Sequence, residues 1–556
     1  MSLIFFVNIA SNLKEPIPDS DFINVKNFVN ANVPNLMNFN IPLITESETR
    51  KMLTNLDVSK ATGLDQIGPK LLKLSADVIS SSITHIINCS ISQGVFPDQW
   101  KSAKVNPLFK KGLANDVNNY RPISILPTLS KLIEKHVHDS FITYLNHYKL
   151  LCKSQSGFRK KHSCETALVH MIDNWLKSLN NGEIVGVVML DFSKAFDLCS
   201  HDILLKKLKI YKCSNITIKW FESYLTNRTQ SVSVNGVISD KQITTCGVPQ
   251  GSILGPLLFL LFINHLPLYV QENDSNVDMY ADDTTIYDIN LSKTVVERNL
   301  QRALNNVSNW CLDNGMVLNA AKTKVLLITT PQKRSQLVNK NLSLHYKDVN
   351  LEITAGDKIL GVYINEKLKW DNHITFVRKK ISTNLWLLSR IKLFLPLHYR
   401  ILFYKAYIQP HLDFCNIIWG STNKSNIQIL IRLQRRACHI ILGEQYTNLN
   451  EALLSINVLS IEQRILLQKA KFMYRVFQNA TPSYIQNMFQ YNNNNHRNLR
   501  SSNHLNVLIP KPNKELFKGS MSYSGAKVWN SIPDYIRLCP TINSFTSNFI
   551  KWIKSG

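Results

Sequence analysis

Two adjacent aspartates stand between two runs of residues that favour β-strands, and this feature constrains the fold more than any other. The segment is Met279-Tyr-Ala-Asp-Asp-Thr-Thr-Ile-Tyr287, and its pattern predicts a β-hairpin with Asp282 and Asp283 at the turn. Neighbouring carboxylates repel each other, so a folded protein keeps them together when a cation, a hydrogen-bonding turn or water offsets the repulsion. Because Asp also favours turns for local reasons, the pair alone is consistent with an exposed hairpin tip as well as with a cation site.

A third carboxylate, Asp191, directly follows the most hydrophobic strand-like segment of the chain. That segment, Ile184-Val-Gly-Val-Val-Met-Leu190, has the composition of a buried strand. A strand that ends at Asp191 and a hairpin that carries Asp282 and Asp283 can bring three carboxylates to one point. Mg²⁺ prefers oxygen ligands, and two such ions can activate a 3′-hydroxyl and stabilise the leaving oxygen of a phosphoryl displacement. The sequence therefore predicts a site for two Mg²⁺ ions, with Mn²⁺ as an alternative ion.

The net charge of the chain indicates a polyanionic partner. In 556 residues, 64 Lys and Arg stand against 39 Asp and Glu, which gives a formal charge of +25. Such an excess favours nucleic acid first and an anionic membrane second, because each neutralised phosphate releases condensed counterions. No apolar segment approaches transmembrane length. The ten Cys form no C-x-x-C pair, which argues against a zinc ribbon and a disulfide framework. We therefore expect an intracellular protein with reduced thiols and no membrane partner.

The sequence changes character several times along its length. Residues 1–44 are rich in Asn and Pro with little periodicity, which predicts an extended lead-in. Thr45 and Glu48 have the spacing of a capping box, which predicts the start of a helix. Between about 100 and 240, short strand-like runs alternate with helical ones. A run of four Asn at 492–495 marks a loop before a small C-terminal unit.

The region after Trp370 predicts a long amphipathic helix. Apolar residues recur there every three or four positions, and they are Ile374, Val377, Ile381, Leu385 and Leu388. Three consecutive basic residues fall mainly on the other faces, and they are Arg378, Lys379 and Lys380. This pattern is typical of a helix that buries one stripe and exposes a basic flank.

Eight motifs follow one another in a fixed order. They are Ala61-Thr-Gly-Leu-Asp65, Tyr120-Arg-Pro-Ile-Ser124, Gln155-Ser-Gly-Phe-Arg159, Asp191-Phe-Ser-Lys-Ala-Phe-Asp197, Gly247-Val-Pro-Gln-Gly-Ser-Ile-Leu-Gly-Pro256, Tyr280-Ala-Asp-Asp283, Asn319-Ala-Ala-Lys-Thr323 and Leu360-Gly-Val362. In this order they resemble the reverse transcriptase region of non-LTR retrotransposons, most of all the jockey and chicken-repeat groups. The resemblance covers nearly all of the chain from about residue 4. It implies an α+β right-hand polymerase with a helical C-terminal region: lead-in 1–44, fingers and palm 45–370, thumb and connection 371–490, and a C-terminal unit 491–556.

The resemblance also implies roles in catalysis. Asp191, Asp282 and Asp283 match the metal ligands of the family. Lys322 corresponds to a general acid that protonates the pyrophosphate leaving group, although a surface Lys has the same local pattern.

Further positions match residues that contact the substrate. Arg121 matches a fingers residue that binds the incoming triphosphate, and Arg159 is a candidate for template or substrate contact. Gln250 and Gly251 match the loop that supports template and nucleotide. Phe196 matches a ring that occupies the space of a ribose 2′-hydroxyl and so excludes ribonucleotides, the alternative being a core Phe. On the predicted thumb helix, the basic flank is expected to follow a phosphate backbone rather than read bases.

The resemblance therefore predicts an RNA-directed DNA polymerase that extends a DNA 3′-hydroxyl on an RNA template with deoxynucleoside triphosphates. Its expected location is the nucleus, with a cytoplasmic ribonucleoprotein stage. The family usually joins this polymerase to an upstream endonuclease, but Phe5-Phe-Val-Asn-Ile9 already resembles the linker that precedes the polymerase. We therefore expect the endonuclease to be absent from this chain. The alternative is a catalytically inactive, truncated relic that binds RNA. Leu198-Cys-Ser-His201 stands where the family commonly has Thr-Val-Asp-His, a departure that touches no predicted metal ligand.

Overall fold

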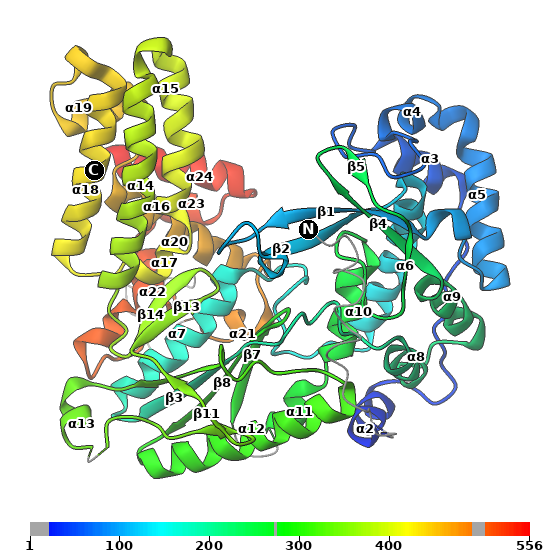
Figure 1. Cartoon of the computed structure of the whole chain (residues 1–556). Coiled ribbons are helices and arrows are strands. Elements are labelled where there is room, and N and C mark those ends of the chain that lie inside the picture. The colour runs from blue at the N-terminus through cyan, green and yellow to red at the C-terminus, as the bar shows by residue number, and fades with distance from the viewer. Residues whose placement is uncertain (1–19, 21, 272–274, 338, 492–505, 556) are drawn as a thin grey trace. The chain divides into compact units, whose positions relative to one another are not determined.

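The computed structural model describes residues 20, 22–271, 275–337, 339–491 and 506–555, which form a mixed α+β fold (Figure 1). The chain divides into two compact units, each built from several segments. Unit 1 comprises Met1–Phe158, Leu190–Asp282 and Arg302–Ala320. Unit 2 comprises Arg159–Met189, Asp283–Gln301 and Ala321–Gly556. No helix among the described residues is long and apolar enough to cross a membrane.

Unit 1 holds a small sheet surrounded by helices. Its helices are α2 (Ile23–Asn32), α3 (Glu46–Thr54), α4 (Pro69–Leu74), α5 (Ala76–Gln93), η1 (Asp98–Trp100), η2 (Val117–Asn119), α6 (Thr128–His147), α8 (His201–Ile210), α9 (Asn215–Leu225), α10 (Leu254–Ile263) and α11 (Leu266–Gln271). Its strands are β1 (Ser102–Phe109), β2 (Tyr120–Ile125), β4 (Arg228–Val234), β5 (Val237–Ile238), β6 (Gln242–Thr244) and β7 (Asn276–Tyr280). The sheet order is β2-β1-β4-β5, and β6 also pairs with β4. Strand β1 lies antiparallel to β2 and parallel to β4.

Unit 2 combines part of a second sheet with most of the long helices. Its strands include β3 (Ile184–Leu190), β8 (Asp283–Asn290), β9 (Lys324–Ile328) and β12 (Glu352–Ile353), in the order β12-β9-β3-β8. The short strands β10 (His345–Tyr346) and β11 (Val349–Asn350) form one pair, and β13 (Gly356–Ile359) and β14 (Val362–Asn365) form another. Strand β3 is buried along almost its whole length and lies antiparallel to β9. The apolar run before Asp191 is therefore the buried strand that its composition predicts.

Unit 2 contains many helices, most of which contribute to one apolar core. They are α7 (Cys164–Asn180), α13 (Pro331–Ser335), α14 (Asp371–Ile391), η3 (Lys392–Phe394), α15 (Leu397–Phe403), η4 (Tyr404–Ile408), α16 (Gln409–Asp413), α17 (Asn416–Trp419), α18 (Lys424–Leu442), η5 (Gly443–Gln445), α19 (Leu449–Ser455), α20 (Ile461–Phe477), α21 (Ser483–Gln486), η6 (Glu515–Gly519), α22 (Met521–Ser531), α23 (Asp534–Arg537) and α24 (Ile542–Ser555). Helix α12 (Lys293–Asn314) belongs to unit 2 up to Gln301 and to unit 1 from Arg302 onward. The core includes Trp175 of α7, Phe472 of α20 and Trp529 of α22, so the described C-terminal residues are packed into this unit.

Two local predictions from the sequence are confirmed. Thr45 caps α3 with a capping box, in which its hydroxyl accepts from the Glu48 backbone N–H. The five apolar positions of α14 are buried, whereas its three consecutive basic residues are exposed.

The prediction of an extended lead-in is wrong for residues 23–32, while residues 1–19 and 21 lie outside the described residues. Helix α2 occupies Ile23–Asn32 and buries Val25 and Val29 on one face. Further along, the Phe39 backbone N–H donates to the Lys212 carbonyl at 2.7 Å. Both residues belong to unit 1, so this part of the lead-in packs against the rest of unit 1. One pair of Val four residues apart is too short a pattern to predict a helix among Asn residues, which favour turns. The four-Asn run at 492–495 lies outside the described residues.

Candidate active site

Asp191 and Asp282 both belong to unit 1, and the charge of Asp191 acts on Asp282. Asp191 is the residue after β3, and its carbonyl accepts a hydrogen bond from the Asn319 N–H at 2.8 Å. Asp282 follows Ala281, whose φ of 58° reverses the chain direction after β7. Burial raises the pKa of Asp282, and the charge of Asp191 raises it further, while the charges of Lys110 and Arg121 lower it. The structure therefore places Asp282 within electrostatic range of a second predicted carboxylate, Asp191, and of two cations, Lys110 and Arg121.

Asp283 begins β8 in unit 2 and is exposed. In the part of the chain that the structure describes, no three His, Cys, Asp or Glu side chains form a group that could hold a metal ion. The predicted set of three carboxylate ligands thus stays a prediction. The pair in unit 1 nevertheless fits a hard divalent cation, because it offers carboxylate oxygens and because such an ion offsets the burial and mutual repulsion of Asp191 and Asp282.

Arg121 and Lys110 come from neighbouring strands of the small sheet. Arg121 is exposed on β2 and pairs with Leu108 of β1. Lys110 directly follows β1, and its backbone N–H donates to the Asn119 carbonyl at 2.8 Å. The antiparallel pairing explains why two residues eleven positions apart both act on Asp282. Sequence reasoning missed Lys110, although two consecutive Lys at the end of a strand-like run were an available signal.

Phe196 is fixed by two other rings. Its ring stacks on Phe259 of α10 with centroids 4.1 Å apart and an interplanar angle of 18°. Phe158 meets it edge to face at 6.2 Å and 86°. The side chain of Phe196 is half-buried, so one part of the ring is held in the packing while another remains accessible. This arrangement agrees with a rigid steric gate, and the role itself stays a prediction.

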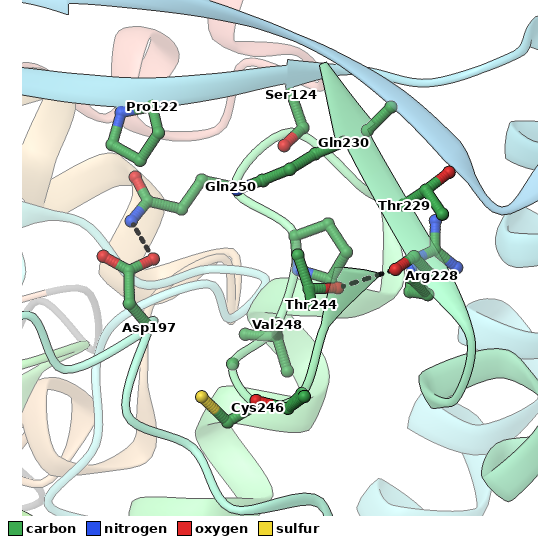
Figure 2. Close-up of a pocket in the computed structure, with 14 residues that line it drawn as sticks. Pro122, Ser124, Asp197, Arg228, Thr229, Gln230, Thr244, Cys246, Val248 and Gln250 are labelled. Atoms are coloured by element: carbon green, nitrogen blue, oxygen red, sulfur yellow. Dashed lines mark hydrogen bonds between the residues drawn. The ribbon is translucent and has the colours of Figure 1, made fainter. Parts of the chain in front are cut away.

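The loop that contains Gln250 and Gly251 is wedged against two other segments. The Gln250 side-chain amide donates to Asp197 Oδ1 at 3.1 Å, and the Gln250 backbone carbonyl accepts from the Ser124 N–H at 2.7 Å. Gly251 has a φ of 128°, and a Cβ there would lie 2.2 Å from the Ser124 carbonyl oxygen. Figure 2 shows Gln250 extending from the loop past Pro122 toward Asp197, in a pocket that these residues line. A side chain at position 251 would push the loop off β2, so glycine is required there.

The helix that follows this loop is anchored by Glu134, a residue that sequence reasoning also missed. Glu134 lies on α6 and is fully buried. Its carboxylate accepts from the backbone N–H groups of Ile253 at 2.7 Å and Leu254 at 3.3 Å, and from the Ser130 hydroxyl at 2.7 Å. Such bonds satisfy the free N–H groups at the start of α10. The available signal was an acidic residue that follows directly on the apolar Leu132 and Ile133.

The ionisation of Asp197, which accepts from Gln250 of the loop, makes the free energy of unfolding depend on pH. Burial raises the pKa of Asp197 to about 6, from an ordinary value of 3.8. The folded state therefore binds a proton between these pH values that the unfolded state has released, and this carboxyl lowers the free energy of unfolding as pH rises through that window. Above pH 6 the full penalty is at most about 3 kcal/mol. Asp197→Asn keeps a side-chain oxygen that accepts from the Gln250 amide. Relative to the wild type, the free energy of unfolding of this variant is expected to increase from pH 4 to 6 and to keep that advantage at higher pH.

Urea denaturation of both proteins at several pH values measures this difference. Because all other carboxyls are shared, subtracting the two curves isolates Asp197. A difference that does not change between pH 4 and 8 would contradict the burial of an ionisable Asp197.

The remaining predicted residues lie in unit 2. Arg159 is half-buried, and Lys322 is exposed in the turn before β9. The three basic residues of α14 are exposed as well. The contacts described within unit 1 do not include them, so their roles stay predictions.

Comparison with known proteins gives one family match and several relatives. Residues 109–364 match the family described as reverse transcriptase (RNA-dependent DNA polymerase). The RNA-directed DNA polymerase from mobile element jockey of Drosophila melanogaster is 29% identical over 423 residues, covering 74% of this chain and 45% of the relative. From the same organism, the probable RNA-directed DNA polymerases from transposon X-element and transposon BS are each 26% identical, over 410 and 458 residues. These cover 71% and 80% of this chain, and 44% and 49% of the relatives. The chain thus spans about half the length of the curated relatives that it matches.

Proposed function

Residues 109–364 are a reverse transcriptase domain related to those of the jockey, X-element and BS elements, and from this premise we propose that the chain is an RNA-directed DNA polymerase of a non-LTR retrotransposon. It extends a DNA 3′-hydroxyl on an RNA template with deoxynucleoside triphosphates. The observation that carries the proposal is the match of residues 109–364 to reverse transcriptases, and within that segment the charges of Asp191, Lys110 and Arg121 all act on Asp282. In this proposal residues 45–370 are fingers and palm, and residues 371–490 are thumb and connection.

Four charged groups of unit 1, Asp191, Asp282, Lys110 and Arg121, each have a task in the proposed reaction. Asp191, Asp282 and Asp283 would hold two Mg²⁺ ions, and bound there the metal would supply activation of the 3′-hydroxyl and stabilisation of the leaving oxygen. Lys110 and Arg121 bind the negative charge of the triphosphate and orient it beside the carboxylates.

Two further side chains complete the proposal. Lys322 protonates the pyrophosphate as it leaves, a general-acid role that suits a positively charged amine. Phe196 excludes a ribose 2′-hydroxyl, because its ring is held by stacking on Phe259 and does not move aside without losing that contact.

A relic that binds RNA without catalysis is the second candidate, and the retained site residues favour the polymerase over it. Primer extension by the purified chain on an RNA template separates the two. DNA synthesis that requires a divalent cation supports the polymerase. RNA binding without any extension, under conditions in which the protein is folded, would support the relic instead.

The exposed basic residues of α14 are expected to bind the template–primer duplex through its phosphates. Replacing Arg378, Lys379 and Lys380 by Gln should weaken duplexes of different sequence alike. Because each lost phosphate contact removes roughly 0.7–0.9 from the slope of log affinity against log salt, the slope should fall by up to about 3. Fluorescence anisotropy with labelled duplexes at several salt concentrations measures both effects.

A matched control removes the same charge elsewhere. Lys511, Lys518 and Lys551 are also exposed, and replacing all three by Gln is expected to change the slope less. If both triple variants lower the slope equally, net charge rather than the α14 surface binds the duplex.

A further inference from the structure

Gln155 lies beside the turn that carries Asp282. Its side chain is buried, with 1% exposure, and belongs to unit 1 together with that turn. The Ala281 N–H donates to Gln155 Oε1 at 2.9 Å, and the Gln155 side-chain amide donates to the Ala281 carbonyl at 3.2 Å. One side chain therefore satisfies both backbone groups of the residue before Asp282. The Ala281 carbonyl belongs to the same peptide unit as the Asp282 nitrogen, so Gln155 fixes the orientation of the peptide that leads into Asp282.

The residues next to Gln155 run along the same turn. The Ser156 N–H donates to the Met279 carbonyl at 2.8 Å, and the Met279 N–H donates to the Ser154 carbonyl at 2.9 Å. The Gly157 N–H donates to Gln155 Oε1 at 2.7 Å, which holds the amide in place. These bonds form a strap of residues 154–157 along the end of β7.

Because Gly157 has no side chain, this strap can lie close to the backbone of Ala281. A Cβ at Gly157 would lie 2.3 Å from the Ala281 nitrogen, a distance at which atoms overlap. Ala281 itself has a φ of 58°, in a region that residues other than glycine adopt only when their surroundings impose it. The paired bonds from Gln155 supply that constraint.

The constraint matters because Asp282 directly follows Ala281 and is only partly buried, so a flexible turn would let its carboxylate leave the position in which it can bind a cation. Ligand-supporting residues of this kind set metal affinity by fixing the ligand orientation. We infer that Gln155 is a positioning residue that holds the Ala281–Asp282 turn in the conformation that binds the divalent cation, an inference that rests on the proposed function.

The test replaces Gln155 by Met, which has a similar length and no hydrogen-bonding amide. Gln434 provides a matched control, because it is also buried with 1% exposure and makes comparable bonds. Its amide donates to the Tyr404 hydroxyl at 3.2 Å and to the Leu459 carbonyl at 2.9 Å, and its oxygen accepts from the Ile461 N–H at 3.2 Å. Gln434→Met thus removes three similar bonds in unit 2.

Two readouts are measured on the full-length chain. Mn²⁺ binding, followed by electron paramagnetic resonance of the free ion, is expected to weaken about 10- to 100-fold in Gln155→Met and to be unchanged in Gln434→Met. In primer extension, Gln155→Met is expected to lower kcat by a similar factor with little change in the KM for the nucleotide. Equal Mn²⁺ affinity in the two Met variants would overturn the inference while leaving the proposed function intact. A wild-type chain that neither binds Mn²⁺ nor extends a primer would overturn both.

A second variant decides the question if Gln155→Met does not fold. Gly157→Ala keeps the amide and displaces the same turn, so it is expected to weaken Mn²⁺ binding at least about tenfold. Gly420→Ala is its control, since a Cβ there would lie at the same 2.3 Å from a backbone atom, the Asn416 carbonyl oxygen. If both Ala variants bind Mn²⁺ as tightly as the wild type, Gln155 and Gly157 do not position Asp282.

Discussion

Replacing Asp282 by Asn is expected to lower kcat for nucleotide addition by at least about 10³-fold, the scale seen when a group essential to the transition state is removed. The substitution keeps the size of the side chain and removes one of the two predicted metal-ligand carboxylates of unit 1. Template binding should change little, because it depends on basic surfaces elsewhere. Single-turnover incorporation of one nucleotide measures the effect without contributions from product release.

Two comparisons show that such a loss comes from chemistry rather than from unfolding. With EDTA present, Asp282→Asn should be at least as stable as the wild type, because one of two repelling carboxylates has been removed. Asp240→Asn changes an exposed aspartate of unit 1 and should retain full activity. An Asp282→Asn protein with more than a tenth of wild-type kcat would contradict the proposed role of this carboxylate.

Replacing Phe196 by Val is expected to admit ribonucleotides while DNA synthesis continues. The stack on Phe259 keeps the wild-type ring in place, so its removal opens space beside the sugar of the incoming nucleotide. Discrimination against ribonucleotides, taken as a ratio of kcat/KM values, should fall at least tenfold and up to about 10²-fold, the range of a steric pocket contact. Single-nucleotide incorporation with paired deoxy- and ribonucleoside triphosphates measures this ratio.

Phe192 supplies the control for this prediction. It lies four residues earlier in the same motif, is 6% exposed and meets Trp310 edge to face at 5.9 Å. Phe192→Val is expected to lower stability by a few kcal/mol and to leave the discrimination ratio unchanged. If Phe196→Val also lowers stability and leaves the discrimination ratio unchanged, Phe196 is a core residue and not a steric gate.

Features with strong local patterns were predictable from the sequence. The buried strand β3, the capping box at Thr45 and the apolar stripe of α14 each follow from residues within a few turns or one strand of each other. The candidate carboxylates were predictable because Asp191 ends an apolar run and Asp282 falls between two strand-forming segments. The charge of Asp191 acts on Asp282 within unit 1, and their role as metal ligands stays a prediction.

The contacts that support the site were not predictable in this way. Gln155 and Ala281 are 126 residues apart, and Glu134 reaches the start of α10 from 119 residues away. Each is a side chain that pairs with backbone groups, and backbone groups carry no residue-specific signal. The effect of Lys110 on Asp282 likewise depends on strand pairing and not on any periodic pattern. Such pairings depend on the complete fold, which is why local rules do not reveal them.

A structure of the protein bound to an RNA template, a DNA primer, a deoxynucleoside triphosphate and Mg²⁺ tests the central claim most directly. We predict that Asp191, Asp282 and Asp283 ligate two Mg²⁺ ions about 3.5–4 Å apart, beside the primer 3′-hydroxyl and the triphosphate. In the same structure Gln155 should keep both of its bonds to Ala281. A complex in which Asp191 lies more than about 10 Å from both other aspartates, too far for two such ions to bridge, would contradict the account.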